Sequence, residues 1–307
     1  MKHNITKGIA FAILAASLYA LNAPFSKILL NSMPPVLMAG FLYAGAGIGM
    51  LLLAFLRSLK KKETKELKLT RAELPYTIAM IVLDIAAPIC LMFGLNATTA
   101  ANASLLNNFE IAATAIIAFI VFKEKISARL WAGILFVTLS CCILSFEDIS
   151  SLRFSYGSLF VLLAAVCWGF ENNCTRKMSS KDPLQIVLLK GIFSGIGSIM
   201  IGLCIGERIE LYRSIAAVLC LGFVSYGLSI YFYVHAQRLL GAARTSAYYA
   251  VSPFIAAVLS LAVFREMPDL SYFAALTLMI IGALLSSRDE PFIKKNKTTG
   301  CSADLTE

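Results

Sequence analysis

The sequence is short of charge. Of its 307 residues, 15% are charged, whereas soluble domains carry about 25%. Apolar residues make up 59% of the chain and the mean hydropathy is +0.78. What remains is too little to cover a 33.3 kDa protein with a water-facing surface. This shortage excludes a soluble enzyme, a nucleic-acid-binding protein and a disordered chain. The sequence therefore predicts a polytopic membrane protein that lies in a lipid bilayer.

Several catalytic and metal-binding patterns are also missing. A phosphate-binding loop is absent, so direct drive by ATP is not expected within this chain. The sequence has no HExxH motif and only two histidines, His3 and His235, which favours neither a metal site nor a cofactor. Its eight cysteines form no CxxC pair and lie mostly in apolar stretches, as small core residues do. A convergent nucleophile and base are not evident, so we do not expect an enzyme.

Long stretches without a charged residue mark the membrane spans. The first stretch is too long for a signal-peptide core and is retained as a span. The residues after 287 are polar and form a tail. The sequence predicts ten transmembrane helices near residues 8–30, 35–57, 74–94, 98–122, 129–146, 155–177, 183–205, 213–237, 243–264 and 269–287.

The distribution of Lys and Arg sets the orientation. With the N-terminus inside and ten alternating spans, the inner segments hold 21 basic residues and the outer segments hold five. Lys27 is among the outer five, and Lys190 lies within a span. Basic residues concentrate in cytoplasmic loops. Both termini are therefore predicted to be cytoplasmic, and the membrane is predicted to be the cell (cytoplasmic) membrane.

The two halves of the chain repeat each other. At an offset of 149, Gly8, Phe11 and Leu14 recur as Gly157, Phe160 and Leu163, and at an offset of 142 the stretch 121–124 recurs as 263–266. Each half holds five spans. Because five is odd, the second copy must cross the membrane in the opposite sense. We expect two inverted five-helix repeats, 8–146 and 155–287, followed by a cytoplasmic tail, 288–307. Such folds bind a solute near the midplane and expose it to either side in turn.

The chain resembles ten-span members of the drug/metabolite transporter superfamily that are built from two EamA-type repeats. The resemblance rests on the helices that begin at Gly8 and Gly157, on Phe122-Lys-Glu124 and Phe264-Arg-Glu266, and on the stretch 240–247 with Pro253-Phe254 after it. It covers about residues 8–287 and implies transport, with export as the family's usual direction. One departure is visible: the ninth span has Ser252-Pro253-Phe254 where the fourth has Glu110-Ile111-Ala112. The two half-sites are therefore chemically unequal.

Ionisable side chains at membrane depth are costly and need a reason. Counted from the helix ends at about 1.5 Å per residue, Glu171 and Lys190 lie at the same depth below the inner interface. Two interpretations remain open for this pair. The residues form a structural ion pair between neighbouring helices, or they lie on the substrate path. Lys190→Ala or Glu171→Gln is expected to abolish solute movement in a folded protein, whereas loss of folded protein would indicate the structural pair.

A polar face surrounds Glu171. Trp168, Glu171 and Asn172 follow helical spacing and must point inward, because a polar face cannot lie against lipid. The counterpart in the first repeat is Asn22, next to Pro24, which distorts helices. We place these residues among the candidate substrate contacts.

Two further carboxylates are candidate proton carriers. Glu110 lies toward the outer half of the membrane with Asn107 on the same face, and Asp84 lies one turn before Pro88. Buried carboxyl groups can load and release protons, so proton coupling is a hypothesis for these two residues. Neutral carboxylic acids hydrogen-bonded between helices are the alternative.

Tyrosines and glycines complete the candidates. Tyr248 and Tyr249 lie about four residues before Pro253, at the depth of a central cavity. Near the inner surface, His235 is interpreted as a structural group. Glycines four residues apart occur at Gly45 and Gly49 and again in the seventh span, which predicts close helix packing.

These observations favour a secondary transporter that moves a small organic metabolite, such as an amino acid or a related compound, outward by alternating access. A nucleotide-sugar or phosphorylated-sugar carrier is an alternative, but it needs several cations facing the cavity and only Lys190 lies firmly inside. A non-transporting membrane sensor or enzyme is the other alternative. The sequence leaves open the substrate, the direction, the coupling ion and whether the protein is a monomer or a homodimer.

Overall fold

The fold is described from a computed structural model. The described residues are 2–59, 67–123, 126–148, 153–178, 181–209, 213–240, 245, 248–265, 268 and 270–287. The predicted tail 288–307 lies outside them.

Helices occupy all ten predicted spans, which confirms the all-α membrane architecture. Six spans are long and apolar enough to cross a membrane, and three shorter apolar helices occupy 128–144, 252–264 and 270–286. A short antiparallel pair, β1 (Phe146–Asp148) and β2 (Arg153–Phe154), was not predicted and joins the two halves. The elements in chain order are α1 (Lys2–Ala20), α2 (Asn22–Leu29), α3 (Pro35–Leu59), η1 (Arg71–Glu73), α4 (Leu74–Ala97), α5 (Ala100–Leu106), α6 (Phe109–Ile120), α7 (Ala128–Leu144), α8 (Tyr156–Met178), α9 (Pro183–Leu189), η2 (Lys190–Ser194), α10 (Gly195–Cys204), α11 (Arg213–Gly222), η3 (Phe223–Leu228), α12 (Ser229–Leu240), α14 (Ser252–Phe264) and α15 (Leu270–Ser287).

Three of the spans are interrupted within the membrane. A proline ring clashes with the carbonyl four residues before it, so Pro24 ends α1 at Ala20 and Pro253 separates α14 from Tyr249. The fourth span is interrupted without a proline, at Asn107, between α5 and α6. Asparagine side chains compete for backbone hydrogen bonds and favour helix ends. At the breaks the backbone N–H groups form turn-type hydrogen bonds, such as Asn108 N–H to Leu105 O and Glu110 N–H to Asn107 O.

Two spans of the second half contain a π-helical segment. The first, η2, begins at Lys190, and the second, η3, contains Tyr226. Such segments insert an extra residue into a turn, redirect the side chains that follow, and often occur at functional sites. The corresponding spans of the first half, α3 and α4, are continuous α-helices.

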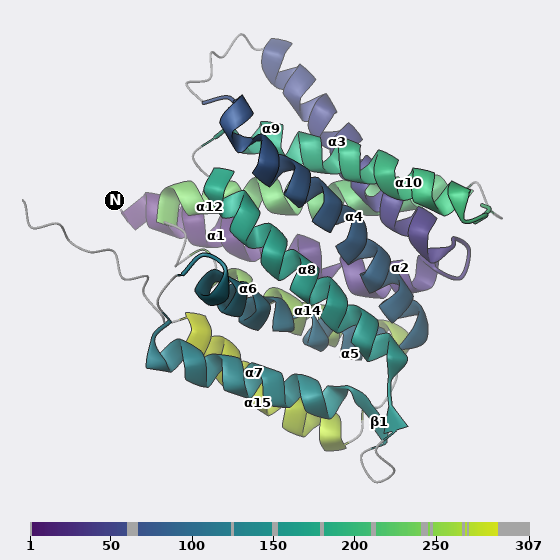
Figure 1. Cartoon of the computed structure of the whole chain (residues 1–307), viewed down its shortest axis with the longest axis vertical. Helices are drawn as coiled ribbons and strands as arrows, with labels where there is room; N and C mark the ends of the chain where they lie inside the picture. Colours follow the sequence, from purple (N-terminus) through teal and green to yellow (C-terminus); the bar gives the residue numbers. More distant parts are fainter. Residues whose placement is uncertain are drawn as a thin grey trace, which may run out of the picture.

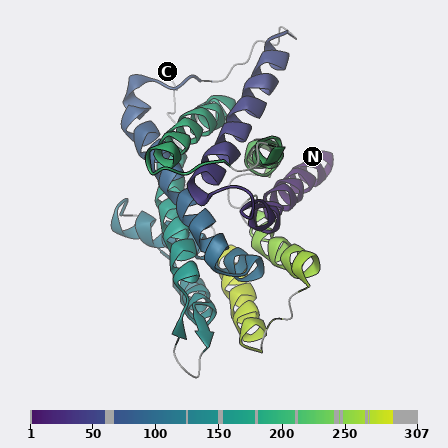
Figure 2. The ribbon, with the colours of Figure 1, turned by 90° about the vertical axis from the view of Figure 1, so that its right-hand side faces the viewer.

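Helix packing follows a regular scheme across the two halves (Figure 1). The third span, α4, packs along α8 of the second half. Its counterpart in the second half, α12, packs along α1 of the first. Likewise α6 contacts α8, and α14 contacts α1. The helix α3 packs on α10, while α7 and α15 pair at one end of the molecule (Figures 1 and 2).

Glycines allow the closest of these helix contacts. A Cβ atom on Gly191 would lie 2.4 Å from the Cα atom of Gly47, and one on Gly45 would lie 2.1 Å from the carbonyl oxygen of Leu219. Side chains at these positions would force α3 away from the second half. The predicted close packing through glycine is confirmed.

One end of the helix bundle is tied by charged side chains that cap helices. Lys27 donates to the carbonyls of Leu95, Asn96 and Thr98, where α4 ends. A cation stabilises a helix C-terminus because the last carbonyls are unpaired and carry partial negative charge. At the start of α3, Glu207 accepts from the backbone N–H groups of Val36 and Leu37.

Candidate functional site

Four buried side chains from four spans form an ion cluster, which comprises Tyr43, Asp84, Glu171 and Lys190. The Lys190 ammonium lies 2.9 Å from Glu171 Oε1 and 3.3 Å from Asp84 Oδ2. The Tyr43 hydroxyl donates to Asp84 Oδ1 at 2.9 Å. Glu171 also accepts a hydrogen bond from Thr175, one turn further along α8. Asp84, Glu171 and Lys190 are 0%, 2% and 8% exposed.

Local helix geometry presents these groups to one another. Lys190 is the first residue of η2, and Gly191 beside it lets the backbone approach α3. In α4, Pro88 cannot donate the backbone hydrogen bond that Asp84 would otherwise accept within the helix. The two charged residues of the 3.3 Å ion pair thus lie at irregular points of their helices: Lys190 at the start of a π-helical segment, and Asp84 at a carbonyl that lacks its helical N–H partner.

The pairing of Glu171 with Lys190 agrees with the equal depth expected from the sequence. Asp84, a candidate proton carrier, also lies beside Lys190, at 3.3 Å. One ammonium thus faces two carboxylates. Buried charges are tolerated when they are paired and hydrogen-bonded, and here the partners converge from α3, α4, α8 and η2.

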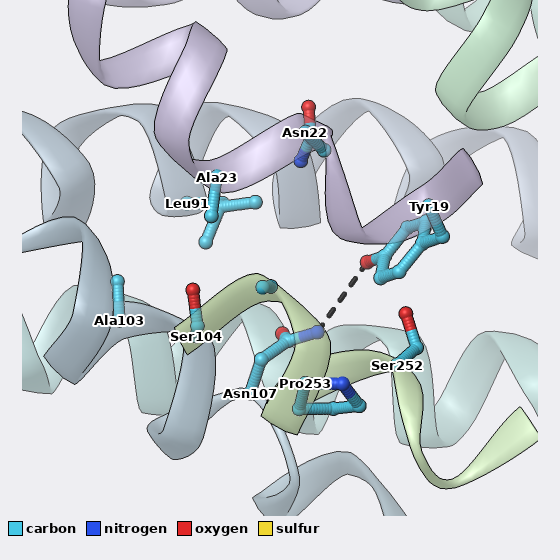
Figure 3. Close-up of a pocket in the computed structure, with 10 residues that line it drawn as sticks. Tyr19, Asn22, Ala23, Leu91, Ala103, Ser104, Asn107, Ser252 and Pro253 are labelled. Carbon is cyan, nitrogen blue, oxygen red and sulfur yellow. Dashed lines mark hydrogen bonds between the residues drawn. The ribbon is translucent and has the colours of Figure 1, made fainter. Parts of the chain in front are cut away.

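A pocket lies where the three interrupted spans meet (Figure 3). Its cavity volume is about 20 Å³, which is space for about one water molecule. Ser104, Asn107 and Ser252 point toward the break between α1 and α2, where Tyr19 and Asn22 lie (Figure 3). The lining residues are Tyr19, Asn22, Ala23, Leu91, Ala103, Ser104, Asn107, Ser252, Pro253 and Ala256.

The polar atoms of this pocket are incompletely partnered. Asn107 donates to the Tyr19 hydroxyl at 3.3 Å, but its Oδ1 atom is buried without a hydrogen-bond partner among the described residues. The next residue, Asn108, is 1% exposed, and both its side-chain polar atoms lack a partner in the same part of the chain. Buried polar groups are nearly always hydrogen-bonded, so an open acceptor that lines a pocket marks a place for a ligand or water.

Five tyrosines connect the ion cluster with the pocket. Successive ring centroids are 5.0 Å apart from Tyr43 to Tyr226, 5.9 Å from Tyr226 to Tyr19, 6.0 Å from Tyr19 to Tyr249 and 4.9 Å from Tyr249 to Tyr233. These distances are typical of interacting aromatic pairs. The five rings therefore form a continuous row of contacts through the core, which we call the tyrosine path.

Hydrogen bonds orient two of these rings. Asn22 donates to the Tyr226 hydroxyl at 3.2 Å and accepts from Ser26 at 3.0 Å. On Tyr249, the hydroxyl lies 3.5 Å from Ser229 Oγ. Asn22 is thus held in place by partners on both sides of its amide.

Glu110 lies in the first turn of α6, three residues after the pocket residue Asn107. Its Oε1 atom accepts from Asn172 at 2.6 Å, and Asn172 also contacts Thr114 at 3.3 Å. The structure gives Glu110 no ion pair with a described cation. Its half-buried side chain therefore has charge to offer to a ligand.

The structure brings most of the predicted site residues together. Trp168 is 6% exposed and lies against the core, as the inward polar face required. Tyr249 makes ring contacts with Tyr19 and Tyr233, whereas Tyr248 is 38% exposed. His235 packs against Phe11 and Tyr231, with ring centroids 6.1 and 4.5 Å away.

Sequence reasoning missed Tyr19 and Tyr43 as site residues. The signal that could have found Tyr19 is its place one turn before Asn22. Among the described residues, the structure finds no group of three His, Cys, Asp or Glu side chains that could hold a metal ion.

Relatives of this chain are described as transporters. A protein of Methanothermobacter thermautotrophicus named "Uncharacterized transporter" is 26% identical over 84% of this chain and 80% of its own length. Another "Uncharacterized transporter", from Clostridium kluyveri, is 25% identical over 91% of this chain and 93% of its own. The "Uncharacterized transporter YyaM" of Bacillus subtilis is 22% identical over 79% of this chain and 80% of its own.

The fold itself is also found in a solved structure. A crystal structure with a TM-score of 0.63 and 17% identity covers 97% of this chain and 99% of its own. The sequence profile of the EamA-like transporter family matches residues 6–146 and again 155–288. The two matches together cover both halves of the chain, and the molecule is a multi-pass membrane protein. The chain belongs to the EamA-like transporter family.

Proposed function

We propose that this protein is a secondary transporter that exports a small organic metabolite, an amino acid or a related compound, across the cytoplasmic membrane. Two inverted repeats, 8–146 and 155–287, alternate in exposing a central site, and both termini are cytoplasmic. The excess of Lys and Arg in the inner segments supports this orientation. Membership of the EamA-like family supports transport, and the family resemblance supports the outward direction.

The observation that carries the proposal is the helix-packing scheme. If each helix of the first half is exchanged for its counterpart in the second, the contact of α4 with α8 becomes that of α12 with α1. The contact of α6 with α8 likewise becomes that of α14 with α1. Contacts that exchange in this way support two related halves that can rock against each other around the pocket.

The pocket and its neighbour Glu110 are the proposed solute site. Asn22, Asn107 and Tyr249 supply polar and aromatic contacts, and Asn172 holds Glu110. The ion cluster is connected to this site by the ring contact of Tyr43 with Tyr226, and Trp168 is a further candidate contact. Tyr248, which is 38% exposed, is retained as a candidate contact too. Lys190 is already engaged by two carboxylates, which argues against the alternative of a phosphorylated substrate.

The test is untargeted metabolite profiling of the medium around cells that produce the wild type or Glu110→Gln at equal membrane abundance. Glu110→Gln is preferred to Lys190→Ala because it leaves the buried ion cluster intact. A metabolite enriched outside only with the wild type is the expected result, and it identifies the substrate and the direction. Equal profiles from the two proteins and from cells without either would contradict constitutive export.

Proton coupling is tested on the same variant. If Glu110 carries the coupled proton, wild-type transport in vesicles responds to an imposed pH gradient and Glu110→Gln transport does not. An unchanged pH response in a Glu110→Gln protein that still transports would clear Glu110 of this role. Glu73→Gln, at the start of α4 and far along the chain from the pocket residues, is the matched control.

A further inference from the structure

Glu110 differs from the other acidic groups of the core in having no cation beside it among the described residues. Asp84 and Glu171 are buried and pair with Lys190, whereas Glu110 is half-buried and bonds to Asn172. The half-buried Lys27 is held by backbone carbonyls at the end of α4. Lys190 contacts both Asp84 and Glu171, so its charge is already shared. Glu110 is bonded instead to the neutral amide of Asn172. A carboxylate in a low-dielectric environment requires a positive partner or a proton.

A second, independent observation lies inside the pocket. The Oδ1 atom of Asn107 is buried, lines the pocket and accepts no hydrogen bond from a described residue, while the side chain is 8% exposed. An amide oxygen without a partner calls for an N–H or O–H donor. Asn107 precedes Glu110 by one helical turn, and the Glu110 N–H donates to the Asn107 carbonyl at 3.1 Å. The open acceptor and the unpaired carboxyl therefore belong to the same turn of the chain.

The surrounding rings favour the same kind of ligand. Tyr19 lines the pocket and packs against Tyr226 and Tyr249, with ring centroids 5.9 and 6.0 Å away. The faces of aromatic rings attract cations, most strongly where water is excluded. A ligand carboxylate would meet Glu110, and Lys190 is already engaged by two acidic groups. Lys27, one turn after Ala23, is held by the carbonyls at the end of α4.

From these observations we infer that the pocket recognises organic cations, namely amines that carry an ammonium group and no carboxylate. The ammonium group donates to Asn107 Oδ1 and neutralises Glu110, while its carbon skeleton packs against Tyr19 and the apolar lining of Leu91 and Ala256. This inference rests on the proposed function and narrows its substrate class from amino acids and related compounds to amines.

The experiment is isothermal titration calorimetry on the purified full chain in lipid nanodiscs at neutral pH. The probes are three pairs that differ in charge at two sizes: propylamine and phenethylamine, alanine and phenylalanine, and propionate and phenylacetate. At least one amine is expected to bind about ten-fold or more tightly than its zwitterionic and anionic partners. The anions also test the opposite orientation of the Asn107 amide, which would present an N–H to the pocket.

Variants assign the binding to this site. Glu110→Gln is expected to weaken amine binding by about ten-fold or more, whereas the matched change Glu73→Gln leaves it unchanged. A failure of both amines to bind, equal binding of an amine and its anion or zwitterion, or unchanged binding to Glu110→Gln would each overturn the inference.

Transport measurements separate this outcome from the fate of the proposed function. Amine binding without amine movement into or out of proteoliposomes would uphold the cation site and contradict transport of this class. Movement of alanine or phenylalanine without amine binding would support transport and overturn the cation site.

Discussion

The ion cluster and the pocket are both polar regions among apolar helices, yet their polar atoms are partnered very differently. In the ion cluster, Lys190 pairs with both Asp84 and Glu171. The hydroxyls of Tyr43 and Thr175 donate further hydrogen bonds to these two carboxylates. In the pocket, Asn107 keeps an acceptor without a described partner, and Glu110 beside it has an amide but no ion pair with a described cation. Asp84 Oδ2 lies 3.3 Å from the Lys190 ammonium and has no hydrogen bond among the described residues. The charges of the first region are thus paired within it, whereas the unpartnered acceptor of the second lines a pocket where a ligand or water can bind.

The difference also follows from the backbone. The ion cluster is built on helices that run through it, with a π-helical turn at Lys190 and a proline one turn after Asp84. The pocket is built where α1, α5 and the span of α14 actually stop and restart. Where a helix stops and restarts, the chain changes direction and a pocket can form between the helices. A distorted but continuous helix keeps its side chains packed against its neighbours. We therefore propose that the ion cluster holds α3, α4, α8 and η2 together and that the pocket binds the solute.

The largest expected effect is that of Lys190→Ala. This change leaves Asp84 and Glu171 buried without their shared cation, so the free energy of unfolding should fall by about 3–5 kcal/mol. Thermal unfolding of the purified protein in detergent measures the loss. Lys181→Ala, which removes the pair with Glu73 at 3.2 Å near the helix ends, is the control and should have little effect. Stability equal to the wild type in Lys190→Ala would mean that the cluster does not hold the helices.

Next in size is the effect of Glu110→Gln on transport. Gln keeps the shape and the contact with Asn172 but loses the charge, so solute flux should fall by about ten-fold or more while the melting temperature stays close to that of the wild type. Flux into proteoliposomes and thermal unfolding are measured on the same preparation. A fall in both quantities would place Glu110 with the ion cluster and remove the distinction between the two regions.

Particular residues show which parts of the fold and of the candidate site can be predicted from the sequence. Charge-free runs located the ten spans because lipid requires long apolar helices, and the pairing of Glu171 with Lys190 followed from their equal distance from helix ends. The contact of Asp84 with the same ammonium could not be predicted, since depth says nothing about which way a helix turns a side chain. Tyr19 and Tyr43 were missed because a tyrosine in an apolar helix is most often an ordinary core or interface residue.

Glu171→Gln sharpens the comparison within the ion cluster. It leaves Asp84 and Lys190 as a one-to-one pair, so the free energy of unfolding should change by less than about 1 kcal/mol, far less than in Lys190→Ala. Solute flux is expected to fall only a few-fold, because the amide oxygen of the substituted side chain can still accept from Lys190. A folded Glu171→Gln protein without any flux would instead put the cluster on the substrate path.

The smallest expected effects come from removing one hydroxyl in each region. Tyr43→Phe removes the hydrogen bond to Asp84, which should lower the free energy of unfolding by about 0.6 kcal/mol, the average for side-chain hydrogen bonds in membranes. Tyr19→Phe makes the same chemical change in the pocket, where it removes the acceptor of the Asn107 N–H. Because Asn107 is then free to reorient, ligand affinity should change more than stability does. Thermal unfolding and calorimetry on both variants test this: Tyr43→Phe should affect mainly unfolding and Tyr19→Phe mainly binding. The reverse assignment would exchange the roles of the two regions, with the charged residues binding the solute and the interrupted helices supporting the fold.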